Sequence, residues 1–272
     1  MVNEKSTERL DKVTIESVIS PESRLLLSRL EILETIDSTN TYLLAQSKAH
    51  TRSGYVCLAE EQTKGRGRQG KEWFSPKGVN IYCSVLWMFP AAQTDISHLS
   101  LAVAVMIVNA LQRYGIEEGL QLKWPNDIYY ANRKLAGVLI EAIPSRVKDY
   151  PVVIGLGLNL ALTKDHPLKQ SAVGVADIVG NQAARNLLAG LIIDELLRQL
   201  PVYVASGFPA FLPEWRKHDM LAGNSTVIHT AQTEISGVAQ GINHAGELVV
   251  RVEDGAMHTF RCGEVSVRLK QR

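Results

Sequence analysis

LKWPNDIYYANRKLAGVLIEA, residues 122–142, contains a clear pattern of strands and a turn. Two apolar runs, 128–130 and 135–142, flank the polar segment 131–134, and this arrangement predicts a β-hairpin with a turn at 131–134. A shorter run at 122–126 predicts a strand that ends at Pro125. The segment therefore predicts neighbouring antiparallel strands.

The segments on both sides of this hairpin show strand and helix patterns. A helix is expected to start at Asp37-Ser38-Thr39-Asn40, where capping residues precede an apolar run. Near the N-terminus, residues 14–19 show only a weak alternation of apolar and polar residues. Residues 62–78 are rich in Gly, Lys and Arg and predict a loop. Buried strands are predicted at 54–61, 79–87 and 151–160, the last with Gly155 and Gly157 allowing close approach, and helices at 96–114, 183–205 and 207–217. The pattern is typical of an α+β protein with a mostly antiparallel sheet.

The last part of the chain has a different texture. Short β-branched runs lie at 226–229, 235–238, 247–252 and 264–269, and turn residues lie at 243–246 and 254–255. These features predict five short strands that form a small β-barrel. We expect an N-terminal extension at 1–30, a main domain at 31–222 and a small all-β domain at 223–272.

The composition is that of an ordinary globular protein. Of the 272 residues, 46% are hydrophobic and 21% are charged, and the formal net charge is +1. Such a balance provides no general attraction for nucleic acid or membranes. The three cysteines and seven histidines are scattered, so neither a disulfide framework nor a metal site is expected. The N-terminus has no apolar signal core and no stretch is long enough to span a bilayer, which predicts a cytoplasmic protein.

Gly65-Arg66-Gly67-Arg68-Gln69-Gly70-Lys71 matches two phosphate-binding motifs. It fits G-x-x-x-x-G-K, the start of a P-loop, and G-x-G-x-x-G, the dinucleotide fingerprint. A P-loop needs a hydroxyl residue after the lysine to bind Mg²⁺, and this chain has Glu72. Both motifs precede a helix, whereas Pro76 and Gly78 disfavour one here. The context therefore speaks against a P-loop or nicotinamide enzyme.

The loop itself suits a site where two anions meet. It carries Lys64, Arg66, Arg68 and Lys71, and an arginine side chain can hold carboxylate or phosphate oxygens with two hydrogen bonds. A solvated basic surface loop is the alternative. Two further segments favour the site: 123–127 offers a cation, an amide and a carboxylate, and 133–137 offers a cation followed by small residues. Core packing for Trp73 and Trp124, and a turn cap for Asp127, are the structural alternatives at these positions.

In this order and at this spacing, these segments resemble the biotin–protein ligase family, the biotin–acetyl-CoA-carboxylase ligases. The resemblance covers about residues 31–270 and rests on segments 37–40, 61–75, 123–128, 134–141 and 155–160. It implies a mixed sheet with helices on one side, followed by a Src-homology-3-like β-barrel. It also implies an enzyme that forms biotinyl-5′-adenylate from biotin and ATP, releases pyrophosphate, and transfers biotin to one lysine of a carrier domain.

The resemblance also assigns residues. Arg68 and Lys134 would contact the biotin carboxylate and the α-phosphate region, where fixed cations remove the repulsion between the two anions, and Asp127 would help to deprotonate the incoming lysine. These three are the expected catalytic residues. The expected biotin-binding residues are Ser38, Thr39, Asn40, Gln62, Arg66, Gly67, Arg68, Lys134 and Gly137. The expected residues for ATP with Mg²⁺ are Arg68, Lys71, Lys123, Asn126, Asp127, Asn159 and Arg268.

A reactive mixed anhydride must be kept from water. A mobile Gly-rich loop that closes over it would provide that protection. Residues 62–78 are therefore expected to be ordered only when ligand is bound. The expected partners are biotin, ATP, the biotin carboxyl carrier domain of acetyl-CoA carboxylase and a second copy of the chain, paired through the main sheet.

The sequence departs from the family pattern in two places. Residues 1–30 are too few for the helix-turn-helix domain of the members that also act as repressors, so no operator binding is expected. Residues 171–180 lack the aromatic that some members place against adenine, which leaves the adenine contacts undefined. Two alternatives stay open: a lipoate ligase with shared loop chemistry and a more apolar pocket, and a non-enzymatic ligand sensor or DNA-binding protein.

Overall fold

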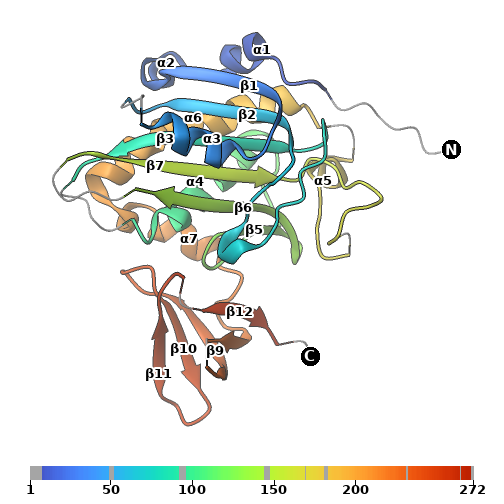
Figure 1. Ribbon diagram of the computed structural model, residues 1–272. Helices are drawn as coiled ribbons and strands as arrows, with labels where there is room; N and C mark the ends of the chain where they lie inside the picture. Colours follow the sequence, from blue (N-terminus) through green and yellow to red (C-terminus); the bar gives the residue numbers. More distant parts are fainter. Residues whose placement is uncertain are drawn as a thin grey trace.

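The computed structural model describes residues 8–48, 52–91, 96–143, 148–168, 170–180, 183–230, 232–263 and 265–270. Figure 1 shows a large sheet with helices against it and a smaller sheet below, formed by the C-terminal strands. Within the described segments, no helix is long and apolar enough to cross a membrane.

The large sheet has seven strands. They are β1 (Arg29–Ile36), β2 (Tyr55–Gln62), β3 (Ile81–Phe89), β4 (Leu120–Lys123), β5 (Asp127–Tyr130), β6 (Arg133–Ala142) and β7 (Tyr150–Leu158), in the order β1-β2-β3-β7-β6-β5-β4. Only β1 and β2 pair in parallel, and the other neighbours pair antiparallel. The prediction of a mixed, mostly antiparallel sheet is confirmed.

The β5–β6 hairpin is confirmed with a tighter turn than expected. Only Ala131 and Asn132 lie outside the strands, and both have positive φ, 46° and 63°. A two-residue turn of this kind matches the twist of the flanking strands. Arg133 and Lys134, which the sequence places in the turn, are therefore the first residues of β6.

Most helices lie on one face of the sheet. The long α4 (Leu99–Arg113) and α6 (Arg185–Ser206) pack together behind it in Figure 1, with η2 (Phe208–Ala210) and α7 (Leu212–His218) beside them. These agree with the predicted helices, except that Phe211 separates η2 from α7 in the last of them. Two shorter helices are α3 (Thr39–Gln46) and α5 (Val175–Val179).

Helix α3 covers the opposite face of the sheet and begins where the sequence predicts. Its N-cap is Ser38, whose side chain accepts a hydrogen bond from the Thr41 amide. Leu43 of α3 is buried in a separate apolar cluster with Tyr55, Leu86 and Val153. The part of this face beside α3 is where the candidate site lies.

The N-terminal segment, where residues 14–19 alternate only weakly, forms α1 (Lys12–Val18) and α2 (Pro21–Leu26). The side chains of Asp11 and Ser20 cap them, and Ile15 of α1 is fully buried. Helix α1 packs on α6 at Gly190, where an added Cβ would lie 2.6 Å from Val18. The short helices therefore depend on packing and caps rather than on a long periodic pattern.

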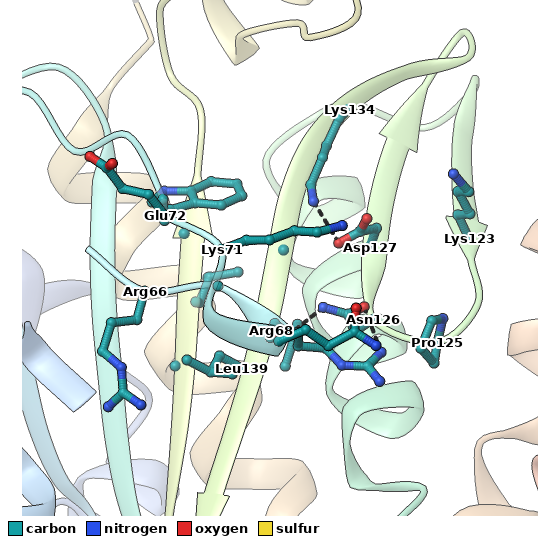
Figure 2. A pocket seen from close by; sticks show the side chains of 18 of the residues that line it. Arg66, Arg68, Lys71, Glu72, Lys123, Pro125, Asn126, Asp127, Lys134 and Leu139 are labelled. Atoms are coloured by element: carbon teal, nitrogen blue, oxygen red, sulfur yellow. Dashed lines mark hydrogen bonds and ion pairs between the residues drawn. The ribbon is translucent and has the colours of Figure 1, made fainter. Parts of the chain in front are cut away.

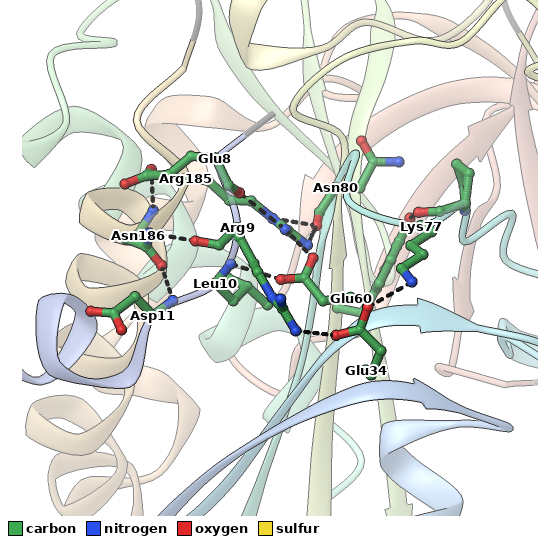
Figure 3. Close-up of polar contacts among 12 residues, drawn as sticks. Glu8, Arg9, Leu10, Asp11, Glu34, Glu60, Lys77, Asn80, Arg185 and Asn186 are labelled. Atoms are coloured by element: carbon green, nitrogen blue, oxygen red, sulfur yellow. Dashed lines mark hydrogen bonds and ion pairs between the residues drawn. The ribbon is translucent and has the colours of Figure 1, made fainter. Parts of the chain in front are cut away.

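A buried ion pair joins this N-terminal segment to the rest of the structure (Figure 3). Arg185 and Glu60 are 0% and 3% exposed and form a salt bridge. The second carboxylate oxygen of Glu60 accepts from the Leu10 amide at 2.7 Å, and Asn186 donates to the Arg9 carbonyl at 2.9 Å. The segment is thus attached through polar groups that would be costly to leave unpaired.

The C-terminal strands form a five-stranded antiparallel sheet. They are β8 (Ser225–His229), β9 (Glu234–Ile242), β10 (Leu248–Val252), β11 (Met257–Phe260) and β12 (Ser266–Leu269), in the order β11-β10-β9-β8-β12. The sequence runs locate all of these except β11. Strands β11 and β12 are the edges of this order, and no pairing among the described residues closes it into a barrel.

The two sheets meet at Trp124, between β4 and β5. The buried Trp124 indole donates to the Gly246 carbonyl, in the β9–β10 turn, at 3.1 Å. Gly246 has a φ of +67°, and a Cβ there would lie 2.5 Å from the His98 ring. Trp124 is therefore packed in the core, the alternative to a ligand contact considered in the sequence analysis. Its hydrogen bond attaches the smaller sheet beside the site.

Replacing Glu60 with Gln tests the buried ion pair. Glu60→Gln should lower the free energy of unfolding by about 3–5 kcal/mol, because the Arg185 guanidinium stays buried without its counter-charge. Urea unfolding followed by circular dichroism measures this change. The matched control is Glu34→Gln, whose exposed bridges to Arg9 and Lys77 should contribute little. Equal shifts for the two variants would contradict the assigned role of Glu60.

Candidate functional site

The loop between β2 and β3 covers a cavity of about 640 Å³. Its other walls come from the start of α3, the neighbouring parts of β5, β6 and β7, and strand β12 of the smaller sheet. Figure 2 shows Arg68, Lys71 and Lys134 pointing toward Asn126 and Asp127, whereas Arg66 points away from them. Predicted site residues that line this cavity are Ser38, Thr39, Asn40, Gln62, Arg66, Gly67, Arg68, Lys71, Lys123, Asn126, Asp127, Lys134, Gly137 and Arg268.

Glycine shapes the covering loop. Gly65 lies so close to the returning chain that an added Cβ would be 2.3 Å from the Trp73 carbonyl oxygen. The backbone pairs again between Arg66 and Glu72, and Arg68–Gly70 forms a short 3₁₀ turn. The loop therefore folds back on itself and presents Arg68 and Lys71 from its tip.

Polar side chains at the start of α3 form one end of the cavity. Gln62 accepts hydrogen bonds from the Thr39 amide at 2.9 Å and the Thr39 hydroxyl at 3.1 Å, and donates to the Ser75 hydroxyl at 3.0 Å. The Asn40 amide oxygen accepts from Ser84 at 2.6 Å. These bonds fix the orientation of the hydroxyl and amide groups that face the cavity.

Asn40 lies directly on strand β7. An added Cβ at Gly155 would be 2.1 Å from the Asn40 Oδ1 atom, so only glycine leaves room for this side chain. On the same strand, an added Cβ at Gly157 would be 2.3 Å from the Trp73 ring, which also rests on Gly137. The close approach expected at Gly155 and Gly157 is confirmed, and the space above Gly137 holds the Trp73 ring.

Glu141 on β6 connects the covering loop to Asn40. Its carboxylate forms a 2.8 Å salt bridge with Arg66 and accepts from the Asn40 amide at 3.0 Å. Sequence reasoning missed Glu141, although it closes the 134–141 motif. It also missed Ser75 and Ser84, because partners this far apart in sequence leave no local signal.

Cationic side chains gather at the other end of the cavity. Lys134 lies 2.8 Å from the Asp127 carboxylate and 5.3 Å from the centre of the Trp73 ring. Arg68 donates to Asn126 Oδ1 at 3.0 Å, and the Asn126 amide donates to the Val138 carbonyl at 2.8 Å. Asn126 is thus held between the loop and β6.

The pKa of Lys123 reflects the positive charge at this end of the cavity. Burial lowers the pKa of its ammonium group, and Asp127 opposes the shift. The charges of Lys134, Arg268 and Lys71 lower that pKa further. Cations from four separate segments therefore share one field, which favours a polyanionic ligand. Among the described residues, no group of three or more His, Cys, Asp or Glu side chains could hold a metal ion by itself.

Asn159 lines a neighbouring cavity of about 500 Å³ instead. Trp73 and Lys134 border both cavities, and Phe74 and His166 contact each other edge to face at 5.4 Å. Burial lowers the pKa of His166, which favours the neutral ring. Residues 171–180 have no aromatic side chain, and the sequence did not predict the group formed by Trp73, Phe74 and His166. The motif gives Trp73 and Phe74, but nothing local signals His166.

Comparisons with known proteins agree with this geometry. A profile of the Biotin/lipoate A/B protein ligase family matches residues 32–159, and one of the Biotin protein ligase C terminal domain matches residues 224–268. The chain is 34% identical to the Bifunctional ligase/repressor BirA of Escherichia coli over 89% of this chain and 74% of that protein. It is 30% identical to the Biotin--[acetyl-CoA-carboxylase] ligase of Paracoccus denitrificans over 81% of this chain and 93% of the relative.

The fold of a solved structure is also similar. The biotin protein ligase from Aquifex aeolicus in complex with biotin and ATP superposes with a TM-score of 0.76 at 24% identity, covering 90% of this chain and all of that one. The identity to the two relatives, the match of both profiles and the shared fold lead to one conclusion: the chain belongs to the biotin protein ligase family.

Proposed function

We propose that this protein activates biotin with Mg²⁺·ATP to biotinyl-5′-adenylate and then attaches biotin to one lysine of the biotin carboxyl carrier domain of acetyl-CoA carboxylase. One observation carries the proposal. A single cavity has hydroxyl and amide groups at one end and cations from separate segments at the other. A neutral ureido ring fits the first end, and a carboxylate beside a triphosphate fits the second.

The ureido group of biotin is assigned to the end formed by Ser38, Thr39, Asn40 and Gln62. A buried N–H or carbonyl left unpaired costs about 1–3 kcal/mol, so prearranged partners favour a ligand with matching polar groups. Arg66 and Gly67 border the cavity from the covering loop, and Gly137 lines it on β6, beside Trp73 and Asp127. Arg66 is engaged by Glu141, so it closes the cavity rather than facing the triphosphate.

The activation step is assigned to the cationic end. A biotin carboxylate oxygen attacks the α-phosphorus of ATP, the new P–O bond forms, and pyrophosphate leaves with the electron pair of the broken bond. Arg68 and Lys134 would offset the repulsion between the two anions and stabilise charge as it develops. Lys71, Lys123 and Arg268 would hold the phosphates, with Asn126 and Asp127 orienting Mg²⁺·ATP. The adenine is assigned to the neighbouring cavity, beside Asn159 and the rings of Trp73 and His166.

The transfer step is assigned to the same cavity. The carrier lysine amine attacks the acyl carbon, the amide bond forms, and AMP leaves. Asp127, whose carboxylate lines the cavity, would accept the proton that the amine loses, and Lys134 lies 2.8 Å from it. We place this reaction in the cytoplasm and expect two copies of the chain to pair through the large sheet. We expect no nucleic acid or membrane partner.

The central prediction concerns substrate choice. Purified protein given biotin and Mg²⁺·ATP should release pyrophosphate and, with a carrier domain present, produce a band that streptavidin detects. Lipoate should support much slower pyrophosphate release, because its dithiolane ring cannot use the hydroxyl and amide groups around Thr39. Equal or faster release with lipoate would favour a lipoate ligase, and no nucleotide consumption with either would refute the proposal.

Lys134→Ala should reduce the rate of adenylate formation by about 100-fold, because a fixed charge at the reacting anions is lost. Lys134→Arg should recover little of that rate, since a planar guanidinium does not replace a compact ammonium in a tight site. Single-turnover assays with radiolabelled ATP measure both rates. Lys217→Ala, which removes an exposed lysine of α7, is the matched control and should leave the rate unchanged. A wild-type rate in Lys134→Ala would remove Lys134 from the mechanism.

Glu141→Gln should loosen the covering loop, because a neutral amide cannot pair with the Arg66 guanidinium. Trypsin should then cut after Arg66 and Arg68 about threefold or more faster in the ligand-free protein. Biotin plus ATP should protect the same bonds further in the wild-type protein, because we propose that residues 62–78 are held fully in place only when ligand is bound. The control Glu214→Gln breaks a pair on α7 and should leave the cleavage rate at the loop unchanged. Equal cutting in Glu141→Gln and wild type would show that Glu141 does not hold the loop.

A further inference from the structure

The mechanism leaves a buried asparagine unused. Asn80 is 0% exposed, so its side chain cannot touch a ligand. It lies between the covering loop and β3, one residue before the Ile81–Leu158 pair that ends the β3–β7 ladder. Its side-chain oxygen accepts from the amides of Leu160 at 2.9 Å and Ala161 at 3.4 Å. Asn80 therefore continues the attachment of the chain after the regular strand pairing has stopped.

The backbone that Asn80 holds directly follows Asn159, which lines the neighbouring cavity. Asn159 directly precedes Leu160, and its carbonyl accepts from the Val175 amide at 3.0 Å. The Leu160 carbonyl accepts from the Ala176 amide at 2.9 Å, and an added Cβ at Gly174 would lie 2.7 Å from that same oxygen. The position of segment 159–161 therefore sets the position of segment 174–176, which follows Ala172 of the same cavity.

Asn80 is itself held in place from behind. Its main-chain carbonyl accepts from Arg185 Nε at 3.1 Å and from Arg185 Nη2 at 2.7 Å. The same guanidinium is paired with Glu60 and contacts the Glu8 carbonyl at 3.3 Å. Figure 3 shows Glu8, Arg185, Glu60 and Asn80 in one connected group. A rigid anchor of this kind is what a side chain needs in order to orient a distant backbone segment.

We propose that Asn80 is a positioning residue for the nucleotide half of the site. Its side-chain oxygen holds residues 160–161, and with them Asn159 and the segment that follows, where a nucleotide base would lie. The catalytic role of Asn80 rests on the proposed function, because the nucleotide base in question is the adenine of ATP. The Asn80 side-chain oxygen is the atom that bonds to segment 160–161, so the proposal concerns that atom.

The first test does not depend on catalysis. In Asn80→Ala, amide hydrogen exchange over residues 159–163 should speed up by about tenfold, because the Leu160 and Ala161 amides lose their acceptor. Asn80→Asp keeps an oxygen at that position and should exchange more slowly than Asn80→Ala. Should Asn80→Ala be too unstable to purify, Asn80→Ser carries the test, since its shorter hydroxyl does not reach both amides. Unchanged exchange in the variant that lacks the amide oxygen would overturn the proposal.

The second test separates positioning from general stability. In Asn80→Ala the KM for ATP should rise by about tenfold, while the dissociation constant of biotin measured without ATP should change by less than about twofold. The matched control is Asn186→Ala. Asn186 is also buried, at 2% exposed, and bonds to Arg9 and Asp11, but has no bond to residues 159–161. Asn186→Ala should lower the melting temperature and leave the KM for ATP unchanged.

The outcomes are distinguishable. Equal losses for ATP and biotin in Asn80→Ala, or the same rise in KM in Asn186→Ala, would assign Asn80 a purely structural role and overturn the proposal. A wild-type protein that forms no biotinyl-adenylate would refute the proposed function instead. The exchange experiment would then still decide whether Asn80 holds residues 160–161.

Discussion

The site is built on two glycines of strand β7, Gly155 and Gly157, which leave room for side chains to lie directly on the backbone. Asn40 rests on β7 at Gly155, and Trp73 rests on it at Gly157, at distances that no other residue type permits. The first contact places the start of α3 against the sheet, and the second places the returning half of the covering loop. The two ends of the cavity are therefore built on alternate residues of the same strand, whose side chains point to the same face.

Electrostatics then divides the cavity into two parts. The polar groups near Thr39 are bonded to one another and are neutral apart from Glu141, which Arg66 neutralises. The charges near Asn126 come from the loop, β4, β6 and β12, and Asp127 forms a salt bridge with one of them, Lys134. Elements distant in the chain supply these cations, so their mutual repulsion is overcome by the folding of both sheets. The cations are therefore already arranged to bind an anionic ligand before it arrives.

Local patterns were sufficient to predict most of the fold. Periodicity and turn chemistry located β2, β3, the β5–β6 hairpin, α4 and α6, and the cap at Ser38 located α3. They missed β11, whose Met257, His258 and Thr259 are exposed and show no apolar alternation, and they extended the hairpin turn into β6. The short α1 and α2 left no clear pattern because they depend on caps and on packing against α6.

The candidate site followed from motifs, whereas its supporting contacts did not. Glu141, Ser84 and Asn80 act on residues far away in the chain, and such pairings appear only once the strands are in register. The roles of the motif residues came from the resemblance to a family rather than from spacing. What the sequence lacked was the set of partners that fix each side chain's orientation.

The smaller sheet completes the cavity only after the large sheet has been synthesised. Val265 to Arg268, close to the end of the described chain, form one wall of the cavity, and the turn at Gly246 binds the Trp124 indole. A chain still emerging from the ribosome can pair β1 to β7 while this wall is absent. Ligand capture would then begin only after β12 has been synthesised and has folded against the cavity, so that polypeptides lacking this strand do not compete for biotin.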